Sequence, residues 1–166
     1  SGDIYTFAEL MNQAAAMYGC TSSNFVNPNG LHDDNHYSTV RDMAKIAQAA
    51  MQNETFRNIA KTFTYTLPRT NLHRSRVLTG VSSNWLNMNQ DTSDGKTSYY
   101  YEYATGIKTG YHARAGYCYV GSAEKDGVEL ISVVFYTRSE GRWTDSKKMM
   151  EYGFSQFVSM TPQELY

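Results

Sequence analysis

Cysteine is scarce in this chain, long hydrophobic runs are absent, and neither sign of charge is in large excess. Its two cysteines, Cys20 and Cys118, are too few for a disulfide framework and are interpreted as free thiols. No run approaches the roughly 18 apolar residues of a membrane-spanning helix, and the first residues lack a signal-peptide pattern. A net charge of −1 predicts neither a nucleic-acid-binding surface nor a polybasic membrane patch.

The chain does contain enough apolar surface for a folded core. Of its 166 residues, 41% are hydrophobic and 14% are aromatic, and 14 are tyrosines. This composition argues against disorder, and the length is typical of a single domain. Internal repeats and low-complexity tracts are absent. The composition therefore predicts an ordinary globular fold.

The first part of the chain has the periodicity of helices. Apolar residues three and four apart predict a helix over residues 4–18, and the turn sequence of residues 27–30 follows it. Thr39 and Asp42 resemble a capping box at the start of a second helix, and a short third helix is expected over 54–60. The apolar face of the second helix would consist of Met43, Ile46, Ala47 and Ala50.

The later part of the chain has the alternation of strands. Residues 63–67 predict a half-buried strand that Pro68 ends. The polar residues 69–98 are then expected to form a long, irregular surface excursion. Further strands are expected near 102–111, 115–123 and 128–137.

Turn and capping signals complete this pattern. Residues 124–127 are a good hairpin turn between the last two strands. Asp145 is expected to cap a final helix. The core face of that helix would consist of Met149, Met150, Gly153, Phe154 and Phe157. The predicted class is α+β, with an antiparallel sheet packed with helices.

The most informative motif is Lys108-Thr109-Gly110, which ends one expected strand just before a hairpin. A Lys-Thr-Gly tripeptide in that position is the third signature of serine enzymes that process D-alanyl peptides and β-lactams. Those enzymes also need a nucleophilic serine followed three residues later by a lysine. The chain has no convincing copy of that pair. The motif therefore indicates the substrate-clamping half of such an enzyme.

Further segments resemble the D-alanyl-D-alanine carboxypeptidases, the low-molecular-mass penicillin-binding proteins of serine peptidase group S11. They occur in the family's order: Phe7 to Asn12, Asn24 to Leu31 with its Asn-Pro-Asn-Gly turn, His36 to Ala44 with its Tyr-Ser-Thr-Val-Arg-Asp-Met sequence, Gly106 to Tyr111, and Ala115 to Cys118. The resemblance implies a β-lactamase/transpeptidase-like fold. Residues 1–166 would form the C-terminal portion of a single catalytic domain, without the N-terminal part that holds the nucleophile and its lysine base.

Simple matches to the absent motifs exist, but their context is wrong for catalysis. Ser93 and Lys96 have the Ser-x-x-Lys spacing, yet they lie in a polar segment where the lysine would stay solvated and protonated. They also stand just before Lys108, whereas the family's nucleophile comes first. The segments 22–24 and 82–84 each fit Ser-x-Asn. The family's own Ser-x-Asn is expected upstream of this chain, so none of these matches is assigned a catalytic role.

The resemblance also implies roles for the residues of the Lys-Thr-Gly strand. Lys108 would hold a positive charge beside the nucleophile, and the Thr109 hydroxyl would bind the terminal carboxylate of the substrate. Gly110 would leave room for a peptide that adds to the sheet as a strand. The backbone N–H of His112, where the family commonly has threonine, would contribute to the oxyanion hole. The alternative for Lys108 is a lysine that guards an exposed strand edge.

Two arginines are candidates for anchoring the substrate carboxylate, because a planar guanidinium suits that group. Arg41 stands at the start of the second helix, and Arg142 follows the last strand in a segment that resembles the family. Either arginine could instead form a structural ion pair. For Arg41 the partner would be Asp42 or Asp34.

The implied function is that of a serine-type D-Ala-D-Ala carboxypeptidase. It would trim peptidoglycan stem peptides through an acyl-enzyme, and β-lactams would acylate the same serine. The resemblance implies no metal or organic cofactor, and His32 and His36 lack a third metal ligand at sensible spacing. The expected location is extracytoplasmic, in the bacterial cell envelope, with any membrane anchor in segments outside this chain. The alternative is a non-catalytic module that binds peptidoglycan or a protein partner.

The resemblance finally implies that residues 128–136 form a central strand of the complete sheet. The nearly continuous apolar run from Leu130 to Phe135 fits that position. Without a neighbour, such a strand would be an exposed apolar edge that promotes aggregation. We therefore expect this strand to pair with the absent N-terminal segment or with a second copy of the chain.

Overall fold

The computed structural model describes residues 2–79, 83–84, 86 and 99–157. Within them the elements are α1 Ile4–Met17, α2 Val40–Met51, α3 Glu54–Lys61, β1 Thr64–Leu67, β2 Arg76–Thr79, β3 Ala104–His112, β4 Gly116–Lys125, β5 Val128–Thr137 and α4 Gly141–Gln156. The helices predicted in the first part of the chain and the three strands predicted near its end are confirmed, with small shifts at their ends.

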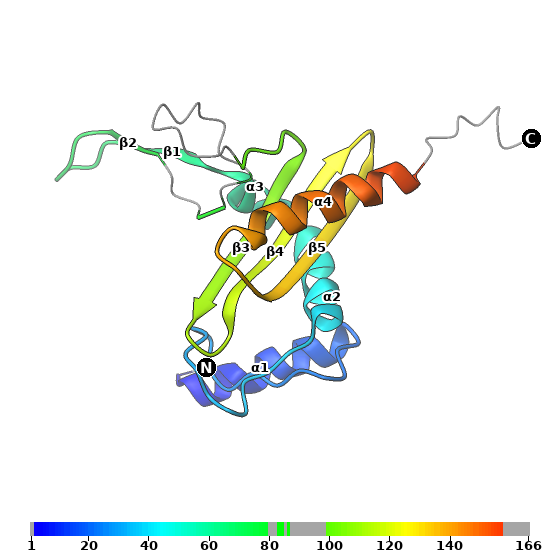
Figure 1. The fold of residues 1–166 in the computed structure, drawn as a ribbon. Helices are drawn as coiled ribbons and strands as arrows, with labels where there is room; N and C mark the ends of the chain where they lie inside the picture. Colours follow the sequence, from blue (N-terminus) through cyan, green and yellow to red (C-terminus); the bar gives the residue numbers. More distant parts are fainter. Residues whose placement is uncertain (1, 80–82, 85, 87–98, 158–166) are drawn as a thin grey trace, which may run out of the picture.

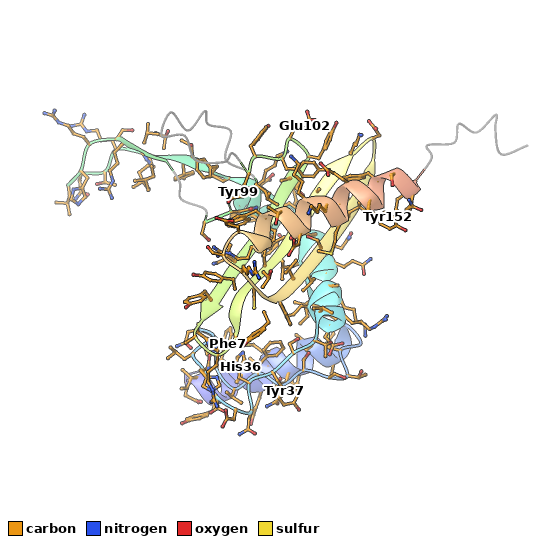
Figure 2. All side chains as sticks on the ribbon, viewed as in Figure 1. Phe7, His36, Tyr37, Tyr99, Glu102 and Tyr152 are labelled. Atoms are coloured by element: carbon orange, nitrogen blue, oxygen red, sulfur yellow. The ribbon has the colours of Figure 1, made fainter. Side chains whose placement is uncertain are left out.

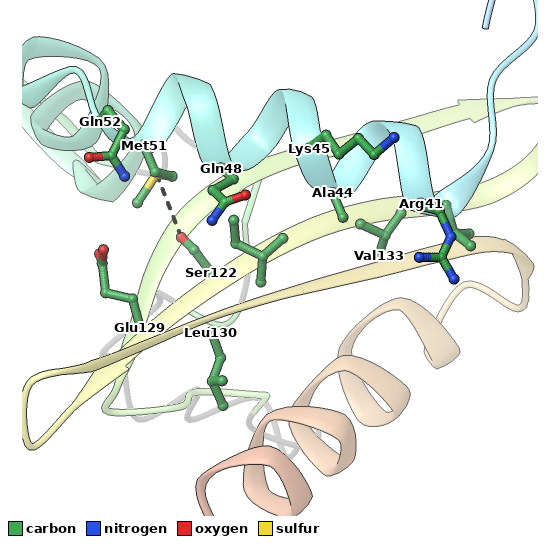
Figure 3. Close-up of a pocket in the computed structure, with 12 residues that line it drawn as sticks. Arg41, Ala44, Lys45, Gln48, Met51, Gln52, Ser122, Glu129, Leu130 and Val133 are labelled. Carbon is green, nitrogen blue, oxygen red and sulfur yellow. Dashed lines mark hydrogen bonds between the residues drawn. The ribbon is translucent and has the colours of Figure 1, made fainter. Parts of the chain in front are cut away.

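Strands β3, β4 and β5 form an antiparallel sheet in that order, so β3 and β5 are its edges among the described residues. Helix α4 packs on one face of the sheet and α2 on the other (Figures 1 and 3). Two adjacent residues of β4 contact helices on opposite faces of the sheet. Gly121 lies against Met150 of α4, whereas the Ser122 hydroxyl is directed at the sulfur of Met51 in α2.

The turn between β4 and β5 confirms the hairpin signal of residues 124–127. Asp126 and Gly127 both have positive φ angles, 51° and 78°. Two consecutive residues with positive φ match the twist of paired antiparallel strands, and Asp-Gly is a favoured sequence for such a turn. This turn lies at the opposite end of the β4 strand from the Lys-Thr-Gly hairpin turn.

The main core lies between α4 and the sheet. Its largest fully buried side chains are Trp143 of α4, Tyr119 of β4 and Leu86. The rings of Trp143 and Tyr119 meet edge to face with their centroids 5.1 Å apart. Burying one large side chain of this kind contributes about 1.5–3 kcal/mol. This cluster therefore holds α4 against β4.

The start of α4 differs from the prediction. The helix begins at Gly141, and the residue before it makes no side-chain capping bond. Asp145 lies inside the helix, where its carboxylate accepts a hydrogen bond of 3.3 Å from the hydroxyl of Thr137 in β5. The predicted cap at Asp145 is therefore wrong, because the helix begins four residues earlier and Asp145 is not at its first turn.

The predicted core face of α4 is right in part. Met150 is buried, and Phe154 packs against the core cluster. Gly153 lies against the side chain of Leu130 on β5. Met149 and Phe157, however, are 42% and 57% exposed, so their assignment to the core face is wrong. Phe157 follows the last residue of α4, and helical spacing does not determine burial beyond the helix end.

The strand predicted over 63–67 exists as β1, and its predicted burial is right only in part, because Phe63 and Leu67 are half-buried. β1 pairs antiparallel with β2, with Tyr65 opposite Leu78, and Tyr65 is 52% exposed. β2 lies inside the segment that was predicted to be irregular, so that prediction is wrong for residues 76–79. Alternation in this segment reflects the two faces of a hairpin and not a face packed on the core. Figure 1 shows this hairpin projecting away from the three-stranded sheet.

Asp42 joins the loop after α1 to the start of α2. The Thr39 hydroxyl caps α2 by accepting the Asp42 N–H, as predicted. The Asp42 side chain is only 2% exposed, and its carboxylate accepts bonds of 2.8 Å from the Ser22 N–H and the Ser23 hydroxyl. Burial alone would raise the pKa of this carboxyl, but these bonds and the nearby Lys45 ammonium bring that pKa below its usual value. Asp42 therefore stays ionised and fixes the loop.

Candidate functional site

The Lys-Thr-Gly motif lies on β3, an edge strand of the sheet among the described residues. Lys108 and Gly110 are exposed and Thr109 is half-buried, with Gly110 opposite Cys118 on β4. A Cβ added at Gly110 would meet its nearest neighbour, the Cys118 Cβ, at an ordinary contact distance of 3.8 Å. The chain's own packing therefore does not require glycine here. Its absence of a side chain keeps the exposed edge open to a ligand.

The polar groups of the motif contact one another and Ser83. The Lys108 ammonium donates to the Thr109 carbonyl oxygen over 2.9 Å. The hydroxyls of Thr109 and Ser83 are 2.7 Å apart. Both Lys108 and Ser83 are exposed. An ammonium and two hydroxyls are thus close together at one solvent-accessible strand edge. Sequence analysis did not identify Ser83 as a neighbour of the motif.

Tyr119 links the core to the start of the same strand. Its hydroxyl lies 2.7 Å from the carbonyl oxygen of Gly106 and 2.9 Å from Oδ1 of Asn84. Burial raises the pKa of Tyr119 far above its usual value, so the phenol stays protonated and can donate. Gly106 stands two residues before Lys108, so this contact fixes the position of the edge strand. Asn84 therefore supports this buried contact, whereas Ser82 of the rejected Ser-x-Asn match lies outside the described residues, so the rejection stays a prediction.

The other rejected matches have two different outcomes. In the 22–24 segment, Asn24 donates through its amide to the Asn35 carbonyl, and the Ser22 N–H donates to Asp42. These groups hold a loop in place. Ser93 and Lys96 lie outside the described residues, so the structure leaves their interpretation as a prediction.

His112 ends β3, and its side chain is engaged by the turn that follows. Its Nδ1 accepts the N–H of Ala115 over 3.2 Å, and its ring centroid lies 5.3 Å from that of His32. Arg114 of the same turn donates to Asp34 over 2.9 Å and lies 2.6 Å from the His32 ring nitrogen. The turn after Lys-Thr-Gly is thereby held against the loop that contains His32 and Asp34.

Arg41 lies away from this edge. It is exposed at the start of α2 and lines an open groove of about 670 Å³ between α2 and strands β4 and β5 (Figure 3). No residue of β3 lines that groove. The ion pairs considered for Arg41 are also wrong, because Asp42 pairs with Lys45 and Asp34 pairs with Arg114. The structure therefore does not bring Arg41 to the Lys-Thr-Gly residues.

Arg142 is held by aromatic rings. Its guanidinium carbon lies 4.6 Å from the ring centroid of Tyr117 and 4.9 Å from that of Trp143. Its Nε donates to the carbonyl of Ser139 over 3.0 Å. Burial lowers the pKa of this guanidinium, which nevertheless stays charged at neutral pH. Arg142 therefore supports the end of β4 through stacking.

Arg138 was not identified from the sequence, although it follows β5 directly. It is exposed and lines a hollow of about 780 Å³ together with Ala113 and Gly116 of the β3–β4 turn. Within the part of the chain that the structure describes, its guanidinium has no ion pair. A sequence signal was available, because an arginine just after the strand next to a Lys-Thr-Gly hairpin lies near its turn. Arg138 is thus a third candidate for binding a carboxylate.

His36 is a structural loop residue, as expected. Its Nδ1 accepts the N–H of Val26 over 3.3 Å, and burial lowers its pKa. Within the described ranges, no group of three ligating side chains could hold a metal ion. The described helices are also too short or too polar for any of them to cross a membrane.

Comparison with known proteins identifies the family. The sequence model of the S11 peptidases, described as D-alanyl-D-alanine carboxypeptidase, matches residues 1–139. A Streptomyces sp. D-alanyl-D-alanine carboxypeptidase is 35% identical over 158 residues, which cover 92% of this chain and 50% of that protein. The Escherichia coli carboxypeptidase DacA is 34% identical over 166 residues, which cover 98% of this chain and 36% of that protein. The chain therefore spans half or less of the length of these relatives.

Solved structures agree with this similarity. The crystal structure of a Streptomyces DD-transpeptidase superposes with a TM-score of 0.74 at 36% identity, over 90% of this chain and 54% of that one. A penicillin-binding protein of Listeria monocytogenes, in its cefotaxime-bound form, superposes with a TM-score of 0.69 at 29% identity, over 89% of this chain and 55% of that one. The fold is thus β-lactamase/transpeptidase-like, and the chain belongs to the peptidase S11 family of D-alanyl-D-alanine carboxypeptidases.

Proposed function

We propose that this chain is the C-terminal part of the catalytic domain of a serine D-Ala-D-Ala carboxypeptidase, and that it supplies the strand on which the substrate is held. The observation that carries the proposal is Lys108-Thr109-Gly110 on an edge strand, in a chain of the S11 family. Relatives named as D-alanyl-D-alanine carboxypeptidases support the reaction class. The substrate would be a peptidoglycan stem peptide, and the protein would then act in the cell envelope.

The proposed reaction has two steps. A serine in a preceding segment attacks the carbonyl carbon of the penultimate D-alanine, the bond to the terminal D-alanine breaks, and the serine proton passes to the leaving amine. Water then hydrolyses the ester, which frees the serine and a peptide shorter by one residue. A β-lactam would be opened at its ring C–N bond by the same attack and would be released slowly. The cefotaxime-bound relative supports β-lactam binding.

The edge strand would act on the substrate by position and charge. The peptide would align along β3 as an added strand, with Gly110 leaving room for its backbone. Lys108 would hold positive charge beside the reacting groups, and Thr109 would exchange its Ser83 contact for the substrate carboxylate. His112 would supply its backbone N–H to the oxyanion, while its side chain stays bonded to the turn.

For the carboxylate anchor, the geometry favours Arg138. Its guanidinium lies exposed beside the β3–β4 turn, whereas Arg142 stacks on Tyr117 and Trp143. Arg41 lines the groove on the α2 face, away from β3. An unpaired guanidinium can form two parallel hydrogen bonds to a carboxylate without first leaving other partners. We therefore rank Arg138 before Arg142, and both before Arg41.

Labelled penicillin tests this proposal. The 166-residue chain alone should form no covalent adduct, because the nucleophilic serine and its lysine base are assigned to a preceding segment. The longer polypeptide that carries that segment should gain the mass of one penicillin. Intact-mass spectrometry reads both outcomes. Acylation of the chain alone, for instance at Ser93, would contradict the assignment. Stem-peptide binding by the longer polypeptide without any acylation would instead identify a non-catalytic module.

We also propose that β5 pairs with the preceding segment of the same protein or with a second copy of this chain. β5 is an edge among the described residues, and its residues 130–135 are nearly all apolar. The groove between α2 and β5 adds apolar surface from Ile131 and Val133 beside this edge (Figure 3). Burial of that surface would favour pairing over exposure to water.

Hydrogen exchange combined with sedimentation tests this pairing. The backbone amides of residues 130–135 that do not face β4 should become protected as the chain concentration rises, or when the preceding segment is present. Amides of residues 119–123 in the central strand β4 are the matched control, because this stretch is already paired with β3 on one side and β5 on the other and should not change. A stable monomer whose outer β5 amides exchange freely at every concentration would rule the pairing out.

A further inference from the structure

The β1–β2 hairpin concentrates positive charge in a chain whose overall net charge is −1. No aspartate or glutamate occurs between Glu54 and Asp91. Arg69, Arg74 and Arg76 all lie in the hairpin, on its turn or at the base of β2. The net charge of the whole chain is near zero, so it does not reveal this local excess of positive charge in the hairpin. The expectation of no polybasic patch rested on that net charge.

These three arginines are available for a partner. Each is exposed, and none forms an ion pair or a side-chain hydrogen bond with the described residues. Arg57, which lies outside the hairpin on α3, shows the contrast because it pairs with Glu124 and Glu129. Figure 2 shows the side chains at the hairpin tip spreading outward, away from the sheet. The hairpin therefore presents, at its projecting end, guanidinium groups that no carboxylate of the described residues neutralises.

The same hairpin exposes apolar side chains. Leu72 at the tip is 79% exposed, and Val77 and Tyr65 on the two strands are 62% and 52% exposed. An isolated two-stranded hairpin is only marginally stable in water. A projecting hairpin with an apolar tip between arginines combines the two features of elements that lie at a membrane interface, namely apolar insertion and attraction to anionic lipid.

We propose that the β1–β2 hairpin docks on the surface of a membrane that contains anionic phospholipid. Arg69, Arg74 and Arg76 bind lipid phosphates, for which the guanidinium fork is well suited. Leu72 enters the interface between headgroups and acyl chains, and Tyr65 lies at the level of the headgroups. A soluble anionic polymer would use the arginines alone and would gain nothing from Leu72. The exposed leucine therefore favours the membrane.

Vesicle sedimentation with the 166-residue chain tests the proposal. The chain should bind vesicles made of equal parts phosphatidylglycerol and phosphatidylcholine, and should bind pure phosphatidylcholine far more weakly. The triple variant Arg69→Gln, Arg74→Gln, Arg76→Gln should bind the anionic vesicles about a hundredfold more weakly, since each arginine near such a surface contributes about 1 kcal/mol. Added salt should weaken wild-type binding because it screens the charges.

A matched control distinguishes the effect of the hairpin arginines from the effect of a change in the net charge of the chain. The variant Lys125→Gln, Lys147→Gln, Lys148→Gln changes the net charge by the same amount outside the hairpin, and should bind almost as the wild type does. Leu72→Ser should weaken vesicle binding and leave binding to soluble polyphosphate unchanged. Equal losses for the two triple variants would overturn the proposal. So would an unchanged Leu72→Ser variant with full competition by polyphosphate, which would instead identify a soluble anionic polymer as the partner.

Discussion

The substitution Lys108→Ala in the longer, catalytically complete polypeptide should slow acylation by penicillin by roughly two orders of magnitude or more. That is the usual cost of removing one preorganised electrostatic contact from an active site. The Lys108 side chain is exposed at the β3 edge and, among the described residues, is bonded only to its neighbour Thr109. Its loss should therefore leave the fold intact, so the effect would report on the site alone.

The matched control is Lys96→Ala. Lys96 belongs to the Ser-x-x-Lys match that was rejected for its polar context, and the substitution should change acylation hardly at all. Stopped-flow measurement of the acylation rate constant, with circular dichroism to check folding, compares the two variants. If both lysines slow acylation equally, the motif assignment is wrong. If neither does, Lys108 is a strand-edge lysine with no part in the reaction.

The largest expected effect on stability follows the substitution Trp143→Ala. Trp143 is 2% exposed and packs edge to face on Tyr119, and it also carries the Arg142 guanidinium. Truncating a buried tryptophan to alanine typically lowers the free energy of unfolding by about 3–5 kcal/mol. Because domains are stable by only about 5–15 kcal/mol, a loss of this size would shift the urea midpoint strongly.

Tyr152→Ala on the same helix is the control. Tyr152 is 69% exposed, so its truncation should change the free energy of unfolding by no more than about 0.5 kcal/mol. Urea unfolding followed by far-ultraviolet circular dichroism measures both variants. Equal urea midpoints for the two variants would show that the packing of Trp143 against Tyr119 does not stabilise the core.

Local signals predicted the framework of the site. The Lys-Thr-Gly strand, its hairpin and the Asp-Gly turn at 126–127 depend on neighbouring residues, so their sequences were sufficient. The Thr39 cap of α2 is local in the same way. The edge position of β3 came from the family resemblance, and the strand order among the described residues agrees with it.

Long-range contacts were not predictable. Arg114 meets His32 and Asp34 only because folding brings the β3–β4 turn onto a loop far away in the sequence. Arg138 lies beside the same turn for the same kind of reason. Asp145 has the chemistry of a helix cap, yet it lies inside α4 and accepts a bond from a hydroxyl on the adjacent strand. Composition and spacing contain no information about such contacts. These contacts depend on which surfaces the fold places side by side.

The Asp126–Gly127 turn has a practical use. Both residues are exposed, nothing lies within 4 Å of the place where a Cβ of Gly127 would stand, and the turn is at the far end of β4 from residues 112–116. Exposed loop tips are the sites where inserted residues are best tolerated. A short affinity tag or a fluorophore-bearing peptide inserted between Asp126 and Gly127 would label the protein while leaving the Lys-Thr-Gly edge and the β3–β4 turn unobstructed.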